Sequence, residues 1–408
     1  MSIKNKLKNS YVAPVYIYLR YWVKRYIVNK SFSSFILEKG VELKPVDKSG
    51  INFFGYYNIS PENMNGDIIY LKVNEEKIRG SLFEPARIML KTLDGSISKI
   101  AETSAWNWQQ GCMLRWMPGW QGHIIYNDYD APTDSYISKI TDSSGNLIKR
   151  FDMPISAVSK CGKLALTLNF DRLALMRPDY GYFNRKANAL PPDHLDGIWR
   201  IDINSAKVEL ILTLEQLKQV SWASTMEGAM HKVNHIDINP DSSRFMFLHR
   251  WKGAQGRFMR LMTANMDGSD IRILNGDIMT SHCCWLNNNE ILSFCEFSGK
   301  RGYFRFFDQL NSASFFSESL PKFDGHPALS YSTSYLYTDS YPGISRFSSL
   351  YLYDFKKDTL RKLGTFHQGL RYRGEMRTDI HPKPGFVENE VFIESAHLGH
   401  RMLFKVKF

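Results

Sequence analysis

Residues 235–251 read HIDINPDSSRFMFLHRW, which is a short strand, a tight polar turn and then a strongly hydrophobic strand. Aromatic and aliphatic residues fill the second strand, whereas Asn, Pro, Asp and Ser fill the turn. The same order of strand, turn and strand occurs seven times in the 408 residues. The other copies are FFGYYNISPENMNGDIIYLKV (53–73), CMLRWMPGWQGHIIYNDY (112–129), SAVSKCGKLALTLNF (156–170), HCCWLNNNEILSFCEF (282–297), HPALSYSTSYLYTDSY (326–341) and HPKPGFVENEVFIESAH (381–397).

The spacing of these copies predicts the architecture. Most of them begin about 40 to 57 residues apart, which is the length of a four-stranded propeller blade. Strand pairs with Asp-Gly turns lie between them, such as KTLDGSISKIAE (91–102) and ANMDGSDIRIL (264–274), and these are typical of hairpins inside a blade. We therefore predict an all-β fold, a seven-bladed β-propeller with a basic N-terminal arm. An array of two-sheet β-sandwiches is the alternative.

The domain organisation follows from the same repeat. Residues 1–45 are expected to form a basic, aromatic arm, and residues 46–408 the propeller. The third and fourth copies begin about 80 residues apart, which predicts an insertion at about 171–230 with a helix near 213–219. The last strand, RMLFKVKF (401–408), is expected to complete a blade begun near residues 41 to 55, so that the closed ring has no long exposed edge.

Charge and cysteine content limit the partners. The formal net charge of +11 favours a polyanionic partner, namely an acidic polysaccharide, an anionic membrane or a nucleic acid. Outside the arm, acidic and basic residues are interspersed, so no nucleic acid is expected. The five cysteines include no CxxC pair, which argues against a disulfide framework and a cysteine zinc site. The sequence also has no signal peptide pattern and no long apolar segment, so a cytoplasmic location is expected.

The first thirty residues contain seven Lys and Arg residues and no acidic residue. Tyrosine, Trp and aliphatic residues alternate with these charges between residues 11 and 28. Such a segment can lie on an anionic membrane, which would place the protein at the periphery of the inner membrane. The alternative is a helix that packs against the propeller and keeps its basic face in water.

A histidine occupies one equivalent position in four consecutive copies, ten residues before the middle of the next strand. Equivalent positions in a propeller lie at equal radius and height, so these imidazoles are expected to converge at one mouth of the central channel. Neutral imidazoles suit a divalent metal, and one of them can instead accept a proton. The alternative is that each histidine holds a turn of its own blade. The four residues are His235, His282, His326 and His381.

Three of these segments resemble the bacterial oligogalacturonate lyases. His235-Ile-Asp-Ile-Asn-Pro, with the later Phe-Leu-His-Arg-Trp, looks like one unit of that family. The segment Ser281-His282-Cys-Cys-Trp285 is similar to the family's His-Glu-x-Trp, with Cys283 in place of Glu. The segment from Asp379 to Phe386 resembles its His-Pro-His-Pro-x-Phe, with Lys383 in place of the second His. The resemblance covers roughly residues 230–408, and Asp324 is the candidate to replace the family's glutamine ligand.

This resemblance implies a seven-bladed propeller that cleaves short acidic oligosaccharides by β-elimination. It implies that His235 is the base and that His282, His326 and His381 bind the metal. Manganese is the expected ion, with zinc or calcium as alternatives. The chemistry requires that the uronate carboxylate is neutralised by a metal or an arginine before a base removes the proton on the neighbouring carbon.

Further candidates come from DRLALMRPDYGYFNR (171–185), at the start of the expected insertion. Tyr182 can supply a proton, and we assign it to the catalytic residues together with Arg172. Arg177, Arg250 and Arg377 are assigned to binding the substrate, because a guanidinium group pairs with a carboxylate through two hydrogen bonds. The alternative is that this segment packs its aromatic residues on the propeller.

The predicted function is metal-assisted β-elimination on an acidic oligosaccharide or polysaccharide that contains uronate. The alternative is a propeller without catalysis that binds an acidic glycan or a protein of surface-polysaccharide metabolism.

Overall fold

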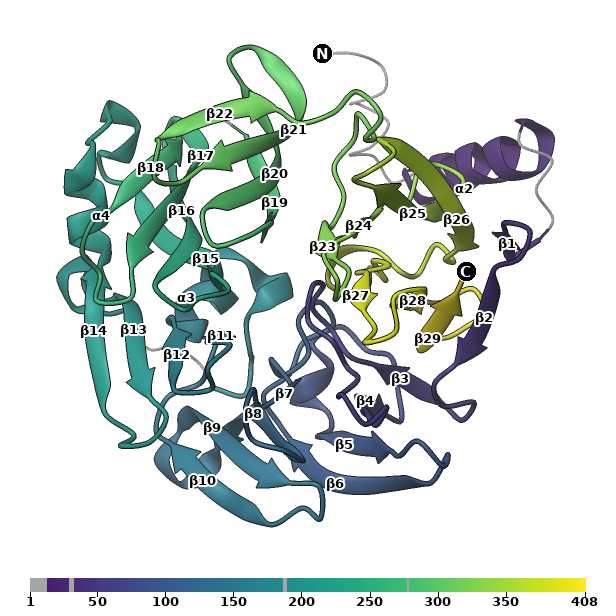
Figure 1. The fold of residues 1–408 in the computed structure, drawn as a ribbon, viewed down its shortest axis with the longest axis horizontal. Helices are drawn as coiled ribbons and strands as arrows, with labels where there is room; N and C mark the ends of the chain where they lie inside the picture. The colour runs from purple at the N-terminus through teal and green to yellow at the C-terminus, as the bar shows by residue number, and fades with distance from the viewer. Residues whose placement is uncertain (1–12, 29–32, 186–188, 277–278) are drawn as a thin grey trace.

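The computed structural model describes residues 13–28, 33–185, 189–276 and 279–408. Its strands form seven antiparallel sheets around a central axis (Figure 1), so the predicted seven-bladed β-propeller is confirmed. We number the blades 1 to 7 along the chain. Within each blade, consecutive strands are neighbours, and the first strand lies nearest the axis.

Blades 1 to 5 each contain four strands from one continuous stretch of chain. Blade 1 contains β3 (Ile51–Phe53), β4 (Ile68–Val73), β5 (Ala86–Lys91) and β6 (Ile97–Thr103), and blade 2 contains β7 (Arg115–Trp116), β8 (His123–Asp130), β9 (Ser135–Asp142) and β10 (Leu147–Phe151). Blade 3 contains β11 (Ala157–Val158), β12 (Leu164–Thr167), β13 (Gly197–Asp202) and β14 (Val208–Thr213). Blade 4 contains β15 (Met230–Ile238), β16 (Arg244–Gly253), β17 (Gly256–Asn265) and β18 (Arg272–Asn275), and blade 5 contains β19 (Thr280–Trp285), β20 (Glu290–Phe297), β21 (Lys300–Phe307) and β22 (Ser312–Phe315).

Blades 6 and 7 take their outermost strands from the N-terminal part of the chain. Blade 6 contains β23 (Ala328–Leu329), β24 (Tyr335–Asp339), β25 (Phe347–Asp354), β26 (Thr359–His367) and β1 (Phe35–Leu37). Blade 7 contains β27 (Lys383–Pro384), β28 (Glu390–Ser395), β29 (Met402–Lys407) and β2 (Glu42–Pro45). The last strand of the chain, β29, therefore pairs with β2, and this pairing closes the ring.

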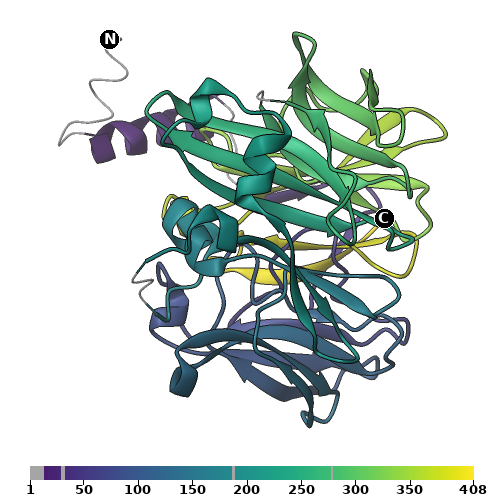
Figure 2. The same ribbon diagram turned by 90° about the vertical axis from the view of Figure 1, so that its left-hand side faces the viewer.

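Helices are short and lie outside the sheets. The first described helix is α2 (Ala13–Trp22), which continues as the π-helical turn η1 (Val23–Val28). Between β12 and β13 lie α3 (Phe170–Met176), η4 (Pro178–Tyr180) and η5 (Asp193–Leu195), and α4 (Leu214–Val220) follows β14 behind a capping box of Thr213 and Gln216. The other short turns are η2 (Gly80–Leu82), η3 (Ala131–Thr133), η6 (Ser224–Met226) and η7 (Gly374–Met376). Seen from the side, α2 and α3 lie toward the same end of the ring (Figure 2). Among the described residues, no helix has both the length and the apolar content needed to span a membrane.

Apolar residues fill the space between neighbouring blades. In β20, the five consecutive residues 291–295 are all buried, because an inner strand is covered by another blade on each face. One apolar cluster joins Ile125 of blade 2, Leu166 of blade 3 and Phe247 of blade 4. Each blade therefore depends on both neighbours for its core.

A buried ionic network joins blade 7 to blade 1. The Glu394 carboxylate accepts hydrogen bonds from the backbone N–H groups of Phe54 (3.1 Å) and Gly55 (2.6 Å). It also pairs with Lys383 at 3.2 Å and with Arg401 at 3.3 Å. All three charged side chains are almost fully buried. This carboxylate therefore ties the last blade to the first.

The substitution Glu394→Ala should lower the free energy of unfolding by about 3–5 kcal/mol, because it leaves Lys383 and Arg401 buried without their carboxylate. Chemical denaturation followed by circular dichroism would measure the change. The matched control is Glu318→Ala, since Glu318 pairs with Lys300 on the exposed surface. The control should lose less than about 1 kcal/mol. A loss at Glu394 as small as that of the control would contradict the role of the network.

Candidate functional site

The four histidines of the repeat come together at the channel. His235 lies on β15 and His282 on β19, whereas His326 and His381 lie just before β23 and β27. The ring centroids are separated by 5.5 Å between His235 and His282, 4.1 Å between His282 and His326, and 4.3 Å between His326 and His381. Blades 4 to 7 each supply one buried imidazole to this histidine cluster.

Irregular backbone aims these side chains. The pairing of β15 with β16 shifts register between Asn234 and Asp237, and the pairing of β19 with β20 shifts between Thr280 and Cys283. A β-bulge of this kind redirects a side chain out of the regular alternation. His235 has φ 53° and His381 has φ 46°, a left-handed conformation that is uncommon and strained for residues other than glycine. The fold therefore holds both imidazoles in place at some energetic cost.

Two of the imidazoles are oriented by acceptors at Nδ1. His326 Nδ1 donates to the Asp339 carboxylate, at 2.8 Å and 2.9 Å from its two oxygens. His381 Nδ1 donates to the carbonyl oxygen of Gly55 at 3.0 Å. Gly55 has φ 115°, and a Cβ there would lie 2.5 Å from the backbone nitrogen of Gly111, so the close approach requires glycine. Both histidines therefore keep the Nε2 lone pair for another partner.

His282 is oriented in the same way. Its Nδ1 lies 3.2 Å from Asp324 Oδ1 and 3.0 Å from Ser281 Oγ, and the Ser281 hydroxyl donates to the same carboxylate at 2.6 Å. The Tyr341 hydroxyl lies 3.5 Å from His282 Nε2 and 3.4 Å from His326 Nε2. The Nε2 atoms of these two histidines therefore share one neighbour.

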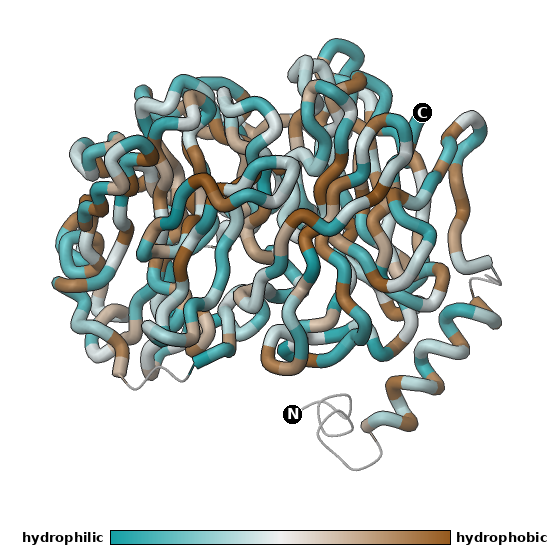
Figure 3. Tube along the Cα trace, turned by 90° about the horizontal axis from the view of Figure 1, so that it is seen from below, coloured by the Kyte–Doolittle hydropathy of each residue, from teal (hydrophilic) through white to brown (hydrophobic). Residues whose placement is uncertain are grey.

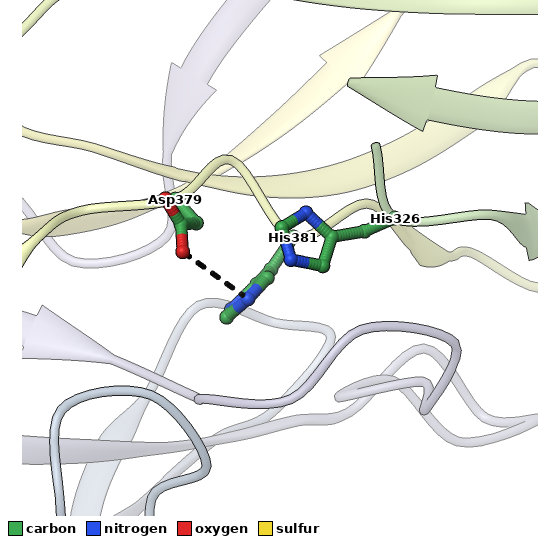
Figure 4. A group of neighbouring side chains, drawn as sticks. All are labelled: His326, Asp379 and His381. Carbon is green, nitrogen blue, oxygen red and sulfur yellow. Dashed lines mark ion pairs between the residues drawn. The ribbon is translucent and has the colours of Figure 1, made fainter. Parts of the chain in front are cut away.

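Three side chains could hold a metal ion. The nearest ligand atoms of His326, Asp379 and His381 all lie within 4.8 Å of one another (Figure 4). His381 Nε2 is 3.8 Å from Asp379 Oδ2, and it is buried without a hydrogen-bond partner among the described residues. A buried lone pair facing a carboxylate suits a divalent cation. The candidate metal site thus contains Asp379 together with two of the predicted ligands. The third predicted ligand, His282, lies next to His326, with ring centroids 4.1 Å apart.

Burial keeps much of the histidine cluster neutral. Burial and the neighbouring His282 lower the pKa of His235 well below its ordinary value. Burial and His326 do the same to His381. Burial opposes a charge on His326 as well, but the Asp339 carboxylate reverses that effect and raises its pKa. A neutral imidazole is the form that binds a metal or accepts a proton.

His235 stands apart from the other three because its partner is a tyrosine. Its Nδ1 is hydrogen-bonded to the Tyr56 hydroxyl, so Nε2 is the nitrogen that remains available to a substrate. The Tyr180 ring packs edge-on against it, with centroids 5.7 Å apart. Burial raises the pKa of Tyr180, which therefore keeps its proton at neutral pH.

Two arginines border the histidine cluster. Arg177 pairs with Asp179 at 3.1 Å and lies 4.5 Å from the centre of the Tyr180 ring. Arg377 pairs with Asp379 at 2.7 Å and lies over the Tyr341 ring. Their side chains are 29% and 22% exposed, whereas the histidines are almost fully buried. The open side of the site is therefore cationic.

A second basic pair lies deeper. Lys232 on β15 and Arg250 on β16 are direct neighbours in the register. Burial and the charge of Arg250 lower the pKa of Lys232 to about 6. Within the described part of the chain, neither side chain has an ion pair or hydrogen bond of its own. Lys232 is therefore mostly deprotonated near pH 7 in the protein without a ligand, and an anionic ligand beside Arg250 would favour its charged form. The sequence analysis missed Lys232, although its position opposite Arg250 was a usable signal.

A small cavity of about 50 Å³ adjoins His235 on the channel side. Tyr56, Tyr57, Arg115 and Asp237 are among the residues that line it. This volume holds a few water molecules and no sugar ring.

Two predicted site residues lie elsewhere. The Arg172 guanidinium is buried, where it pairs with Asp196 at 2.6 Å and donates to the carbonyl oxygens of Pro191 and His231. Tyr182 is also buried; its ring stacks on Phe170 and its hydroxyl accepts from Asn127. The structure thus brings Arg177, Arg250 and Arg377 to the histidines and leaves Arg172 and Tyr182 in packed surroundings.

Comparison with known proteins gives the class of fold. No protein-family model and no curated protein sequence matches the chain. Among solved structures, an oligogalacturonate lyase in complex with manganese is 13% identical, with a TM-score of 0.64, over 92% of this chain and 96% of that one. An oligogalacturonate lyase from Vibrio parahaemolyticus is 12% identical, with a TM-score of 0.60, over 91% and 96%. The tricorn protease is 11% identical, with a TM-score of 0.52, over 88% of this chain and 34% of that one.

These likenesses define a seven-bladed β-propeller of the class that includes both lyases and peptidases. Within that class, the chain has the fold seen in oligogalacturonate lyase over almost its whole length. Identities of this order establish the fold. The chemistry has to be argued from the residues of the site.

The substitution Lys232→Met should stabilise the protein near pH 7 by about 1 kcal/mol or more, because burial forces Lys232 to lose on folding the proton that it keeps in the unfolded chain. The pKa of Lys232 is about 6 in the folded chain and about 10.5 when unfolded, so the unfolded chain binds more protons between these values. The stability of the unmodified protein should therefore rise with pH across that window, and the advantage of the variant should shrink.

Thermal unfolding at several pH values would measure this effect. Lys207→Met is the matched control, since the Lys207 side chain is 73% exposed. Its effect should stay within about 0.5 kcal/mol at every pH. A Lys232→Met variant that is less stable than the unmodified protein across the window would refute the argument.

Proposed function

We propose that this propeller cleaves a uronate-containing acidic oligosaccharide or polysaccharide by metal-assisted β-elimination. One observation carries the proposal: His235, with its Nε2 available, shares the histidine cluster with the His326, Asp379 and His381 group that suits a divalent cation, and His282 lies between them. A base next to a cation site is the arrangement needed to remove a proton close to a carboxylate. The solved structure of similar fold that contains manganese supports the same choice of ion.

Each residue then has a defined task. His326, Asp379 and His381 would hold the cation, which supplies positive charge to the substrate carboxylate when bound. His235 accepts the proton from the carbon next to that carboxylate. Tyr180 keeps its own proton and packs against His235, so it can donate to the leaving oxygen.

The basic side chains select and orient the substrate. Arg177 and Arg377 lie at the open side, where a carboxylate can approach them from solvent. Arg250 provides positive charge further in, and Lys232 beside it would gain a proton when an anion binds; neither has an ion pair or hydrogen bond among the described residues. A chain of several uronates would present an anionic group to each pair in turn. We therefore propose an acidic glycan as the ligand.

The unmodified protein, incubated with manganese and a panel of acidic polysaccharides and oligosaccharides, should form the unsaturated uronate that elimination produces. Ultraviolet absorbance measures this product directly. His235→Ala should abolish turnover and keep the bound metal, because His235 acts as the base. His381→Ala should lose both, because His381 supplies an unpaired Nε2. Metal content, measured by mass spectrometry, separates the two variants.

The control is His123→Ala, because the His123 side chain hydrogen-bonds to the Gln121 carbonyl oxygen in a turn of blade 2. This variant should keep both metal and turnover. If no glycan gives product and the purified protein binds no manganese, the proposal is wrong. Glycan binding under those conditions would indicate a propeller that binds without catalysis.

A further inference from the structure

We propose that the helical segment α2 with η1 docks the protein on an anionic lipid surface. The outward face of this segment is apolar and aromatic, and each of its residues is between 42% and 59% exposed. These residues recur every three or four positions, as expected for one side of a helix. They are Val15, Tyr18, Leu19, Trp22, Val23, Ile27 and Val28, and we call them the apolar face.

The opposite side of the segment is attached to blade 6 by polar contacts. The Tyr21 hydroxyl lies 3.1 Å from His367 Nε2, and Arg25 Nη1 lies 2.8 Å from the same nitrogen. The Arg25 guanidinium also lies 5.8 Å from the centre of the Phe347 ring. This orientation reverses the usual pattern, in which a surface helix buries its apolar side. Figure 3 shows the helix standing off from the ring.

Charge identifies an anionic partner for this apolar face. Residues 1–30 carry seven Lys and Arg residues and no Asp or Glu, and Lys24 is exposed on the helical segment. Apolar side chains that enter a bilayer boundary, with basic residues beside them, are the pattern of a helix lying on an anionic membrane. Trp22 and Tyr18 are residue types that favour that boundary. Sixteen helical residues are also too few to span a bilayer.

The attachment of the helix to blade 6 also determines which side of the ring would face the lipid. Arg346 lies close enough to interact electrostatically with both Tyr21 of the helix and Asp379 of the cluster. The helix also lies toward the same end of the ring as α3, which Arg177 directly follows (Figure 2). Docking through the apolar face would turn that end of the ring toward the membrane. This inference concerns location, and it holds whether or not the propeller is a lyase.

The test is sedimentation of the full chain with vesicles of phosphatidylcholine alone, or of phosphatidylcholine with phosphatidylglycerol. Binding to the anionic vesicles should be at least about tenfold stronger than to the neutral ones. It should weaken when NaCl is raised from about 0.1 M to about 0.5 M. The variant Val15→Ser/Leu19→Ser/Trp22→Ser should lose binding to the anionic vesicles, because its helix no longer has an apolar surface to insert.

The matched control replaces two exposed leucines on blade loops, Leu93→Ser/Leu310→Ser, which are 77% and 74% exposed. This control should bind like the unmodified protein, and thermal unfolding should show that both variants remain folded. Equal binding to neutral and anionic vesicles, or unchanged binding of the triple variant, would overturn the proposal. So would light scattering that shows the apolar face buried in a dimer, with no vesicle binding.

Discussion

The pairing of β2 with β29 is the constraint on which the rest of the structure depends. The histidine cluster takes one imidazole from each of four blades, so its geometry is defined only when the ring is closed. Closure joins strands about 360 residues apart in sequence. The Glu394 carboxylate adds a second connection, from blade 7 to the loop that carries Gly55. The carbonyl oxygen of Gly55 also accepts the hydrogen bond from His381. The same residue therefore helps both to close the ring and to orient a side chain of the site.

A closed ring also explains how strained backbone persists at the site. His235 and His381 both adopt left-handed conformations, which cost of order 1 kcal/mol or more each. Such conformations survive only where the surroundings leave no alternative. Blade packing on both faces provides this restraint, and the bulges in β15 and β19 use it to turn side chains into the channel.

Sequence reasoning found what is periodic and missed what is not. The blades were predictable because one pattern of strand and turn recurs, and the histidines because they keep one place in that pattern. The strand β1 is too short to show any alternation, so its blade could not be assigned, whereas β2 lies in the segment that was expected to pair with the last strand. Asp339 and Gly55 orient the imidazoles from other turns and strands, and no spacing indicates such contacts. In the segment 171–185, Tyr180 packs against His235 and Tyr182 packs against Phe170. The conformation of this loop determines which tyrosine reaches the site, and the sequence pattern does not reveal that conformation.

The proposal of an anionic ligand rests most directly on Lys232 and Arg250, which have no ion pair or hydrogen bond among the described residues. A protein selected only for stability would pair Lys232 with a carboxylate or replace it, because a buried cation destabilises the folded state. Arg177 and Arg377 each have an aspartate beside them, whereas Lys232 and Arg250 face each other across two strands. Burial and Arg250 keep Lys232 deprotonated near pH 7, and an anion bound between the two side chains would restore its proton. The contrast between paired charges at the rim and unpaired charges inside thus favours a ligand whose negative groups reach past the arginines to the inner strands of blade 4.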